Sequence, residues 1–477
     1  MPKRKLVIGE SPGIVAELIM KHHGTFVTLR ESKPSILYYD SGIYHFGAES
    51  LIIEKAKSYC GNLLNRLFVT DLLLHVQAST YLSDMTKPWS EQFDTDLNIV
   101  NVRSGLLNIK TGELMEHTPA YLSLSQLPVT YDPEADCPTI RKFFAQVLKP
   151  QDIDLVEELF GYCLLKAYPF HRIFLLYGKG ENGKSTLLEL LRAFLGKDNC
   201  SGIPLQTLEE HRFAMSQLQG KLANIVADLK GKALSETGTI KMLTGEDTVT
   251  GERKFKDFFT FRNHAKLIFS ANNPPIVADD SLAWWRRQVV IEFPNTFPAD
   301  RRDLNILSKL TIDRELSGLL NIALGGLRRL LSNGDFSYKP KPMDVQKQYS
   351  KLSDSAKAFV EENCHFSPDA LISKPHLYKL YCDYCDQWNI PKKDPIGFSM
   401  RLKQLYPDIM TGKLTVGKER QNCYQGIGCE GISVPFASLG LSEPEDSEHL
   451  AIVADITEEQ RQLNLKCPLK QRKGVTK

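Results

Sequence analysis

Residues 172–196, RIFLLYGKGENGKSTLLELLRAFLG, carry the pattern that decides the fold. An apolar strand precedes a glycine-rich turn of the form GxxxxGKS, and an amphipathic helix follows it. Glycines let successive backbone N–H groups point inward around a polyphosphate. The following helix aims its positive N-terminus at the same anion. The stretch therefore predicts a phosphate loop that binds a nucleoside triphosphate, and its strand and helix flanks argue against a chance match.

Each position of this loop has an expected role. Lys184 is placed to reach the β- and γ-phosphates, and the hydroxyl of Ser185 is placed to bind Mg²⁺. The expected cofactors are therefore ATP and Mg²⁺. The predicted nucleotide-binding residues are Gly178, Lys179, Gly180, Glu181, Asn182, Gly183, Lys184, Ser185 and Thr186.

The bulk composition narrows the class of protein. A chain of 477 residues is too long for one core, and 42% hydrophobic content is ordinary for a globular protein. The net charge of +2 confines any nucleic-acid surface to local patches. The basic N-terminus is followed by too short an apolar run for a signal peptide, and no stretch is long enough to span a membrane. Ten scattered cysteines do not form a disulfide framework, so a cytoplasmic location is expected.

The chain divides into segments of different character. Short strand and helix signals are mixed at the start, and helical periodicity follows around a break at Lys149-Pro150. Apolar runs separated by helices then predict an α/β sheet covered on both faces. Three helices and a hairpin near the end predict a winged helix. The expected domains are an N-terminal α+β domain (1–135), a helical collar (136–170), an ATPase domain (171–335), a winged helix (343–430) and a charged, disordered tail (431–477).

Polar residues follow the next apolar strands. LANIVAD ends in Asp228, and its separation from Lys184 fits a strand returning beside the phosphate-loop strand. LIFSANN ends in Asn272, which can orient the attacking water. AWWRRQVVIEF then supplies Arg286 and Arg287, and a guanidinium facing a neighbouring subunit's γ-phosphate would stabilise the transition state. Singly, each could equally be a strand cap or a surface ion pair; as an ordered set they indicate a catalytic site.

This order of motifs resembles the superfamily 3 helicases, a branch of the AAA+ ATPases found in viruses, phages and plasmids. The closer resemblance is to the primase-helicase C-terminal region of phage and plasmid replication proteins, related to the poxvirus-type helicase-primase. It extends over roughly residues 20–430. The stretches that carry it include FGYCLLKAY, GKGENGKSTLLELL, EEHRFAMSQLQGKLANIVADL, IKMLTGEDTVTGERKFKDFFTFRNHAKLIFSANNPP and AWWRRQVVIEFPNTF.

The resemblance implies an AAA+ ATPase core that works as a ring, expected to be a hexamer. It implies that Lys184 and Asp228 act in catalysis, that Ser185 and Asp228 serve the metal, and that Asn272 is the sensor asparagine. It implies that Arg286 or Arg287 is an arginine finger. Residues 251–261 match a DNA-gripping hairpin, where Arg253, Lys254 and Lys256 would touch phosphates and Phe255 could stack.

Two assignments stay open at this point. Asp228 is flanked by Ala227 and Leu229 rather than by a second acid, so Mg²⁺ binding and water activation are not separable; Glu236 and Asp247 are candidates to share the work. The two adjacent arginines are expected on a strand, where their side chains would face opposite sides, so only one can be the finger.

Three tempting features have plainer interpretations. Cys382 and Cys385 have zinc-like spacing, with Cys423 and Cys429 downstream, but they lie in an amphipathic helix and are expected to be structural. Asp94-Thr-Asp96 looks like paired primase acids, yet its polar flanks favour a loop. His264 is as consistent with a strand-edge role as with a DNA contact.

The predicted function is ATP-driven unwinding of DNA in plasmid, phage or virus replication. The alternative is a DNA-binding AAA+ ATPase that loads or remodels replication proteins without unwinding; a combined primase-helicase is opposed by the missing primase acids. Expected partners are single-stranded DNA in the pore, duplex DNA at the winged helix, further copies of the chain, and a separate primase or polymerase. The expected duplex contacts are Arg401, Lys403, Lys413, Lys418 and Arg420.

Overall fold

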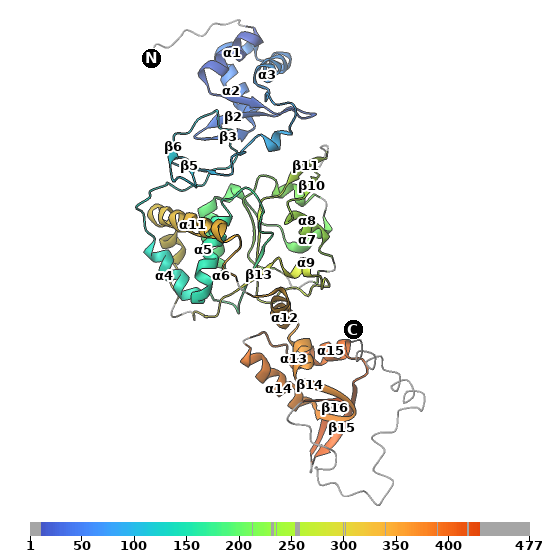
Figure 1. Cartoon of the computed structure of the whole chain (residues 1–477). Helices are drawn as coiled ribbons and strands as arrows, with labels where there is room; N and C mark the ends of the chain where they lie inside the picture. The colour runs from blue at the N-terminus through green and yellow to red at the C-terminus, as the bar shows by residue number, and fades with distance from the viewer. Residues whose placement is uncertain are drawn as a thin grey trace, which may run out of the picture. The chain divides into compact units, whose positions relative to one another are not determined.

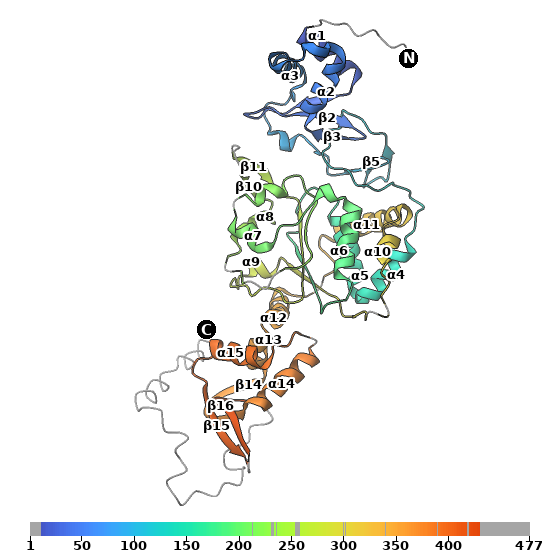
Figure 2. The same cartoon turned by 180° about the vertical axis from the view of Figure 1, so that it is seen from behind.

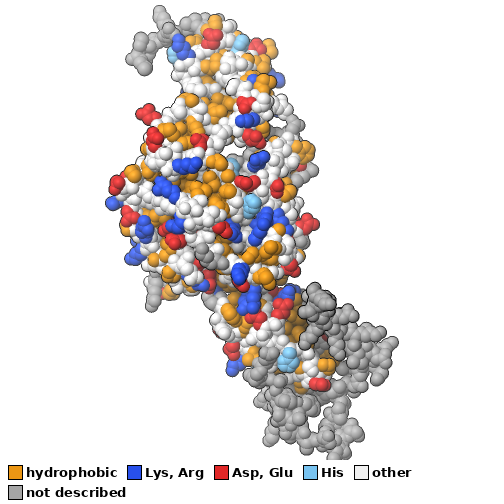
Figure 3. Space-filling model, viewed as in Figure 1, with side chains coloured by type: hydrophobic (Ala, Val, Ile, Leu, Met, Phe, Trp, Pro, Cys, Tyr) orange, Lys and Arg blue, Asp and Glu red, His pale blue; other side chains and the backbone are white. Residues whose placement is uncertain are grey.

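The computed structural model describes residues 11–429, apart from 212, 230–232, 235, 253–257, 299, 301, 339, 389 and 417–418, and apart from the side chains of 414–416 and 419–420 (Figure 1). The predicted tail, residues 431–477, lies outside the described residues. The chain divides into two compact units, Met1–Val345 and Gln346–Lys477. On the face drawn in Figure 3, basic and acidic side chains are interspersed, in keeping with the small net charge.

The first unit begins with a three-stranded antiparallel sheet of order β1-β2-β3 under three helices. A tight turn joins β2 to β3, where Ser41 and Gly42 have the positive φ values of 47° and 99° that such a turn needs. A second small antiparallel sheet follows. The elements are α1 (Pro12–His22), β1 (Phe26–Thr28), β2 (Ile36–Asp40), β3 (Ile43–Phe46), α2 (Ala48–Cys60), α3 (Arg66–Thr80), β4 (Ile99–Val102), β5 (Gly105–Asn108) and β6 (Leu114–Met115).

A five-stranded sheet organises the remainder of the first unit, and its paired strands are all parallel. Its order is β13-β7-β12-β9-β8. All four predicted strands are present, and β8 was not predicted. The prediction that the Asp228 strand returns beside the phosphate-loop strand is wrong, because β12 lies between β7 and β9. The strands are β7 (Ile173–Tyr177), β8 (Cys200–Ser201), β9 (Ala223–Val226), β12 (Lys266–Ala271) and β13 (Gln288–Glu292).

Helices cover both faces of this sheet, as expected for parallel strands that are buried throughout. Figures 1 and 2 show α4, α5, α6 and α11 gathered on one side and α7, α8 and α9 on the other. The helices are α4 (Pro138–Val147), α5 (Ile153–Tyr162), α6 (Lys184–Leu195), α7 (Leu205–Glu210), α8 (Gly238–Leu243), α9 (Leu282–Trp285), α10 (Ile306–Leu310) and α11 (Asp313–Asn333).

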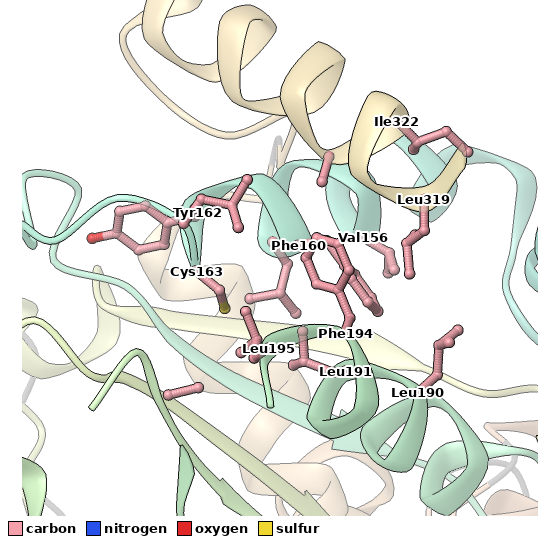
Figure 4. Close-up of a cluster of buried hydrophobic side chains, with 14 of the residues drawn as sticks. Val156, Phe160, Tyr162, Cys163, Leu190, Leu191, Phe194, Leu195, Leu319 and Ile322 are labelled. Atoms are coloured by element: carbon pink, nitrogen blue, oxygen red, sulfur yellow. The ribbon is translucent and has the colours of Figure 1, made fainter. Parts of the chain in front are cut away.

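The main hydrophobic core lies between the sheet and α5, α6 and α11. Phe160 and Phe194 meet there with ring centroids 5.7 Å apart, and Leu191 and Leu319 pack around them (Figure 4). Every second residue of β7 faces this core, because strand side chains alternate. Phe174 and Leu176 belong to it, whereas the intervening Leu175 does not.

Glycines bring α11 unusually close to its neighbours. A Cβ on Gly161 of α5 would lie 2.3 Å from the carbonyl oxygen of Ala323, and one on Gly326 of α11 would lie 2.6 Å from the backbone of Glu157. A Cβ on Gly318 would meet the backbone of Asp136 at 2.4 Å. Backbone is therefore pressed against backbone along this contact.

Two buried glutamates hold the same contact through hydrogen bonds. The carboxylate of Glu315 accepts the amides of Thr139 and Ile140 at 3.1 and 3.0 Å, which satisfies free donors at the start of α4. Glu158 is fully buried on α5 and receives the guanidinium of Arg329 at 2.8 Å. These bonds fix α4 and α5 against α11.

Besides most of α12, the described part of the second unit contains three helices and a three-stranded antiparallel sheet of order β14-β16-β15. The three helices and the terminal hairpin were predicted, but β14 was not. Its irregular register between Phe366 and Leu371, around Pro368, obscured the strand pattern. The elements are α12 (Pro342–Ser353, which crosses the boundary), α13 (Ser355–Asn363), β14 (Cys364–Ser373), α14 (Lys374–Gln387), α15 (Pro395–Leu405), β15 (Met410–Val416) and β16 (Glu419–Cys429). Among the described residues, no helix is both long and apolar enough to cross a membrane.

The glycine contact on α11 predicts opposite effects for two adjacent substitutions. Gly326→Ala should destabilise the protein by about 1–3 kcal/mol, since the new methyl meets the backbone of α5. Gly325 is exposed with open space around it, so Gly325→Ala should stabilise the helix by about 0.5–1 kcal/mol. Chemical unfolding followed by circular dichroism measures both. Equal effects of the two changes would contradict the close helix contact.

Candidate nucleotide-binding site

The predicted phosphate loop opens into a cavity of about 730 Å³ at the carboxyl edge of the five-stranded sheet. The loop follows β7, and α6 begins within it at Lys184. Polar residues at the ends of β9 and β12 line the same cavity. Because β12 separates β7 from β9, the end of β12 lies between the loop and Asp228. The remaining walls come from α4 and from residues 297–309.

Local sterics explain why glycines occupy the two ends of the loop. A Cβ on Gly178 would lie 2.1 Å from the Nδ2 of Asn182 and 2.7 Å from the carbonyl oxygen of Phe293. Gly183 has a φ of 89°, and its Cβ would lie 2.6 Å from Val147 of α4. Both positions therefore require the absence of a side chain.

Glu181 holds the tip of the loop in an unfavourable backbone conformation. Its φ of 66° is in the left-handed region, which costs free energy for a residue with a side chain. The amide of Phe297 donates to its carbonyl at 2.8 Å, and the guanidinium of Arg302 pairs with its carboxylate. Phe297 and Arg302 thus stabilise the loop from outside.

Lys184 is buried, with 6% of its surface exposed, and its ammonium group is held by three oxygens. The Nζ donates to the carbonyl of Gly178 at 2.6 Å, to the Oδ1 of Asn182 at 2.9 Å and to the Oδ1 of Asn272 at 3.1 Å. Burial lowers the pKa of Lys184 to about 8, against the opposing effect of the Asp228 carboxylate. The contact with Asn272 joins the phosphate loop to the end of β12.

Among the described residues that line the cavity, one carboxylate has no hydrogen bond or ion pair. Glu181 pairs with Arg302, and Asp303 pairs with Lys309 at 2.5 Å. In the described part of the chain, no hydrogen bond or ion pair engages the carboxylate of Asp228, which is exposed and lines the cavity. Ser185 is exposed in the same cavity at the first turn of α6.

Glu236 and Asp247, the other acids considered, do not line this cavity. Both are exposed elsewhere, Glu236 ahead of α8 and Asp247 ahead of β10 (Thr248–Gly251). Of these three acids, Asp228 is the one that lines the cavity.

Sequence reasoning missed three cations that line the cavity, Lys142 on α4, Arg302 and Lys309. They come from segments outside the strand-loop-helix motif, so no local signal marked them. Arg302 and Lys309 are already paired with acids. Lys142 is exposed and lies beside Phe143 and Gln146 on the α4 wall.

The two predicted finger arginines lie at the opposite edge of the same sheet. The amide of Ile173, at the start of β7, donates to the carbonyl of Arg287 at 2.7 Å. The expectation that both arginines belong to a strand is wrong, because they form a turn between α9 and β13. Neither lines the nucleotide cavity of its own chain.

The turn nevertheless separates the two side chains as expected. Arg287 is 7% exposed and donates to the Oγ1 of Thr244 at 3.0 Å and to the carbonyl of Ala283 at 2.5 Å. Burial lowers its pKa from the usual value, as does the neighbouring Arg286. Arg286 is exposed, and its carbonyl accepts a hydrogen bond from Arg172. Of the two arginines, Arg286 is the one with an exposed side chain.

The predicted DNA-contacting residues are only partly described. β10 pairs with β11 (Phe259–Arg262) as an antiparallel hairpin, but Arg253, Lys254, Phe255 and Lys256 lie outside the described residues. In the second unit, Lys403 on α15 and Lys413 on β15 are exposed. Lys418 and the side chain of Arg420 lie outside the described residues.

Arg401 has a structural partner. Its guanidinium pairs with Asp354, the N-cap residue of α13, at 2.7 and 2.8 Å, and so ties α15 to α13.

Asp94, Cys382, Cys385 and His264 lie outside the lining of the nucleotide cavity. Asp94 forms an ion pair with Lys166 at 2.6 Å and accepts hydrogen bonds from Ser123 and Leu124. Cys382 and Cys385 lie on α14, and no cluster of metal-ligating side chains is present among the described residues. Burial, together with Lys266 and Lys166, lowers the pKa of His264 to about 3, so its imidazole is neutral.

Three family models match separate parts of the chain. Residues 18–149 match the model described as D5 N terminal like. Residues 176–287, which contain the phosphate loop, Asp228 and Asn272, match a family of unknown function (DUF5906). Residues 353–431 match the RFX DNA-binding domain.

A relative from Acanthamoeba polyphaga mimivirus, named "Putative helicase L207/L206", is 33% identical over 155 residues. The match covers 30% of this chain and 16% of that protein. Part of this chain is thus similar to a small part of a viral protein named as a putative helicase.

Among solved structures, the A form apo structure of the NrS-1 C terminal region has a TM-score of 0.45 at 12% identity, covering 88% of this chain and 100% of that one. A further apo structure of the same region has a TM-score of 0.43, again at 12% identity, with the same coverage of both chains.

The depressed pKa of Lys184 predicts proton uptake on nucleotide binding. Bound phosphates favour the charged ammonium, so they should raise the pKa of Lys184 above about 8. Nucleotide binding at about pH 9 should therefore take up a proton. The affinity for nucleotide should fall as pH rises past about 8, because the free lysine is then increasingly neutral. Calorimetry in two buffers of different ionisation enthalpy measures the uptake. Lys184→Arg, which does not titrate in this range, is the control. Wild-type binding at about pH 9 without proton uptake would contradict the depressed pKa.

Proposed function

We propose that this chain is an ATP-driven helicase of virus, phage or plasmid replication. The observation that carries the proposal is the convergence of Lys184, Asp228 and Asn272 on one cavity, although they lie far apart in sequence. The D5-type match and the mimivirus relative support the replication role.

The cavity residues fit ATP and Mg²⁺. A volume of about 730 Å³ is in the range of ligand pockets. The glycine-lined loop presents backbone amides to a polyphosphate, and Lys184 can exchange its three neutral oxygen partners for phosphate oxygens. Ser185 and Asp228 offer the hard oxygen ligands that Mg²⁺ prefers, and the ion would neutralise phosphate charge.

Residues of the chain divide the hydrolytic work. Lys184 holds the terminal phosphates, and the amide of Asn272, released from Lys184, orients the attacking water. Asp228 is the carboxylate available to organise the metal or accept the proton of that water, because Glu181 and Asp303 are paired with other side chains.

The position of Arg286 favours a site shared between chains. It is exposed at the edge of the sheet opposite the phosphate loop, so it can act only on the nucleotide of a neighbouring copy. A ring satisfies this requirement for every copy, and a hexamer is the assembly that we propose. The turn that carries Arg286 is held by Arg172, whose guanidinium donates to the carbonyl of Arg286. Arg172 is in turn paired with Asp335 at 2.6 Å.

DNA is the proposed substrate of the motor. The β10–β11 hairpin would carry Arg253, Lys254 and Lys256 to one strand in the pore. The second unit has the element order that a winged helix requires, and its match to the RFX DNA-binding domain supports duplex binding there. The alternative is a DNA-binding ATPase that loads or remodels replication proteins. It would hydrolyse ATP in the same cavity but would not separate DNA strands.

Unwinding tests the proposal directly. Wild-type protein with ATP and Mg²⁺ should separate a forked duplex, and Lys184→Ala should abolish both hydrolysis and strand separation. The variant should keep its fold, because Lys184 lines an open cavity. ATP hydrolysis without strand separation would favour the loader alternative, and hydrolysis by Lys184→Ala would place the active site elsewhere.

The two arginines should differ on substitution. Arg286→Ala should bind nucleotide normally and lose most hydrolysis, whereas Arg287→Ala should lower stability by about 1–3 kcal/mol by leaving buried acceptors unpaired. Mixed assemblies of Arg286→Ala and Lys184→Ala subunits should regain part of the hydrolytic rate, because some interfaces then combine an intact loop with an intact finger. A complete lack of rescue would exclude the shared site.

Removal of residues 354–477 should leave ATP hydrolysis largely intact, since the cavity belongs to the first unit. Duplex affinity should fall and its dependence on salt should flatten, because fewer counterions are released. Fluorescence anisotropy over a salt series measures both quantities. Unchanged affinity and slope would refute duplex binding by the second unit.

A further inference from the structure

A second cavity of about 1150 Å³ lies in the first unit, between its N-terminal part and the ATPase sheet. One wall is formed by residues 43–46, 89–97 and 124–128, and the other by residues 192–199, 219–221 and 261–264. We call it the aromatic-basic cleft. The ion pair of Asp94 with Lys166 and the hydrogen bond from Asn199 to the carbonyl of Gln126, at 2.8 Å, join the two walls.

The N-terminal wall of the cleft is aromatic. Phe46 is 52% exposed, and its ring meets that of Trp89 with centroids 6.0 Å apart. Trp89 in turn contacts the buried Phe93 at 6.3 Å, and its indole N–H donates to the carboxylate of Glu31 at 2.9 Å. The indole is therefore fixed in orientation while part of its surface stays accessible, which suits a stacking platform.

The opposite wall is basic. Lys197 and Arg262 are exposed there, beside Lys221, whose ammonium donates to the carbonyl of Asp198. Over the whole cleft, five lysine and arginine side chains face three carboxylates. One of these carboxylates, that of Asp94, is neutralised by Lys166. Arg192 is paired with Glu189, outside the cleft, at 3.7 Å. Lys197, Lys221 and Arg262 then face Glu91 and Asp198, so the cleft keeps an excess of positive charge.

The cleft is continuous with the β10–β11 hairpin. Arg262 is the last residue of β11, and the neighbouring Phe261 also lines the cleft. The base of the hairpin, at Phe261 and Arg262, therefore forms part of the cleft wall.

We infer that the aromatic-basic cleft binds single-stranded nucleic acid, with bases stacked on Phe46 and Trp89 and phosphates on Lys197 and Arg262. Aromatic surface opposite cations is the arrangement that sequence-independent single-strand binding requires. A duplex cannot use the aromatic wall, because its bases are already stacked on one another. The inference rests on the proposed function for the source of the strand, which the motor would deliver from the hairpin.

Binding of a fluorescein-labelled oligothymidylate to the full chain, without nucleotide, tests the cleft. Trp89→Ala with Phe46→Ala should weaken affinity roughly fivefold to a hundredfold. Lys197→Glu with Arg262→Glu should weaken it and reduce the salt slope by about 1.4 for two lost phosphate contacts. Lys57→Glu, an exposed change on α2 away from the cleft, should have little effect. Unchanged affinity in both double variants would overturn the inference.

Tryptophan fluorescence gives an independent measurement. Trp284 and Trp285 are buried and Trp388 lies in the second unit, so the oligonucleotide should quench chiefly Trp89. Trp89→Phe should remove the quenching and keep most of the affinity, since a ring remains to stack. Quenching that persists in Trp89→Phe would contradict stacking at this site.

The cleft and the motor fail separately. Lys184→Ala should bind the oligothymidylate as the wild type does, because the cleft does not contain the phosphate loop. If the wild type showed no ATP hydrolysis that DNA stimulates, the helicase proposal would be refuted, and the oligothymidylate binding assay would still test the cleft. Normal hydrolysis and unwinding with unaffected binding by the cleft variants would refute the cleft alone.

Discussion

The parallel alignment of β7, β12 and β9 is the constraint on which the site depends. Parallel strands deliver their carboxyl ends to one edge, so the residues after them meet although long segments separate them in sequence. The same alignment sends the turn before β13 to the other edge. Five residues of strand correspond to about 16 Å, which is too far for Arg286 to reach the phosphate loop of its own chain. One sheet therefore forms the cavity at one edge and places Arg286 at the other.

The charge of Lys184 dominates the electrostatics of the cavity. Its ammonium is buried among neutral oxygens, which accept its hydrogen bonds, and burial lowers its pKa to about 8. In the proposed function, a bound phosphate would supply the compensating negative charge. It would also release the amide of Asn272, which shares a hydrogen bond with Lys184. Charge compensation at Lys184 and the positioning of the attacking water would then be coupled through one contact.

The sequence predicted the phosphate loop, the four long strands and the three helices of the second unit, because each carries a local pattern of glycines or apolar spacing. The prediction that β9 lies beside β7 was wrong, because the number of residues between two strands does not show whether a third strand lies between them. It could not rank Arg286 against Arg287, whose difference lies in the contacts that bury Arg287. The cations Lys142, Arg302 and Lys309 and the aromatic wall at Trp89 come from distant segments and became visible only in three dimensions.

The glycines of α11 fix the helix contact in a single register. A shift by one residue would bring Leu327 in place of Gly326 against the backbone of α5, where there is no room for a side chain. Gly318, by its close backbone contact, and Glu315, by its hydrogen bonds, also fix the start of α4. Phe143 and Val147 of α4 form one wall of the nucleotide cavity. The glycines of α11, a helix that does not line the nucleotide cavity, thus set the position of α4 and with it the width of that cavity.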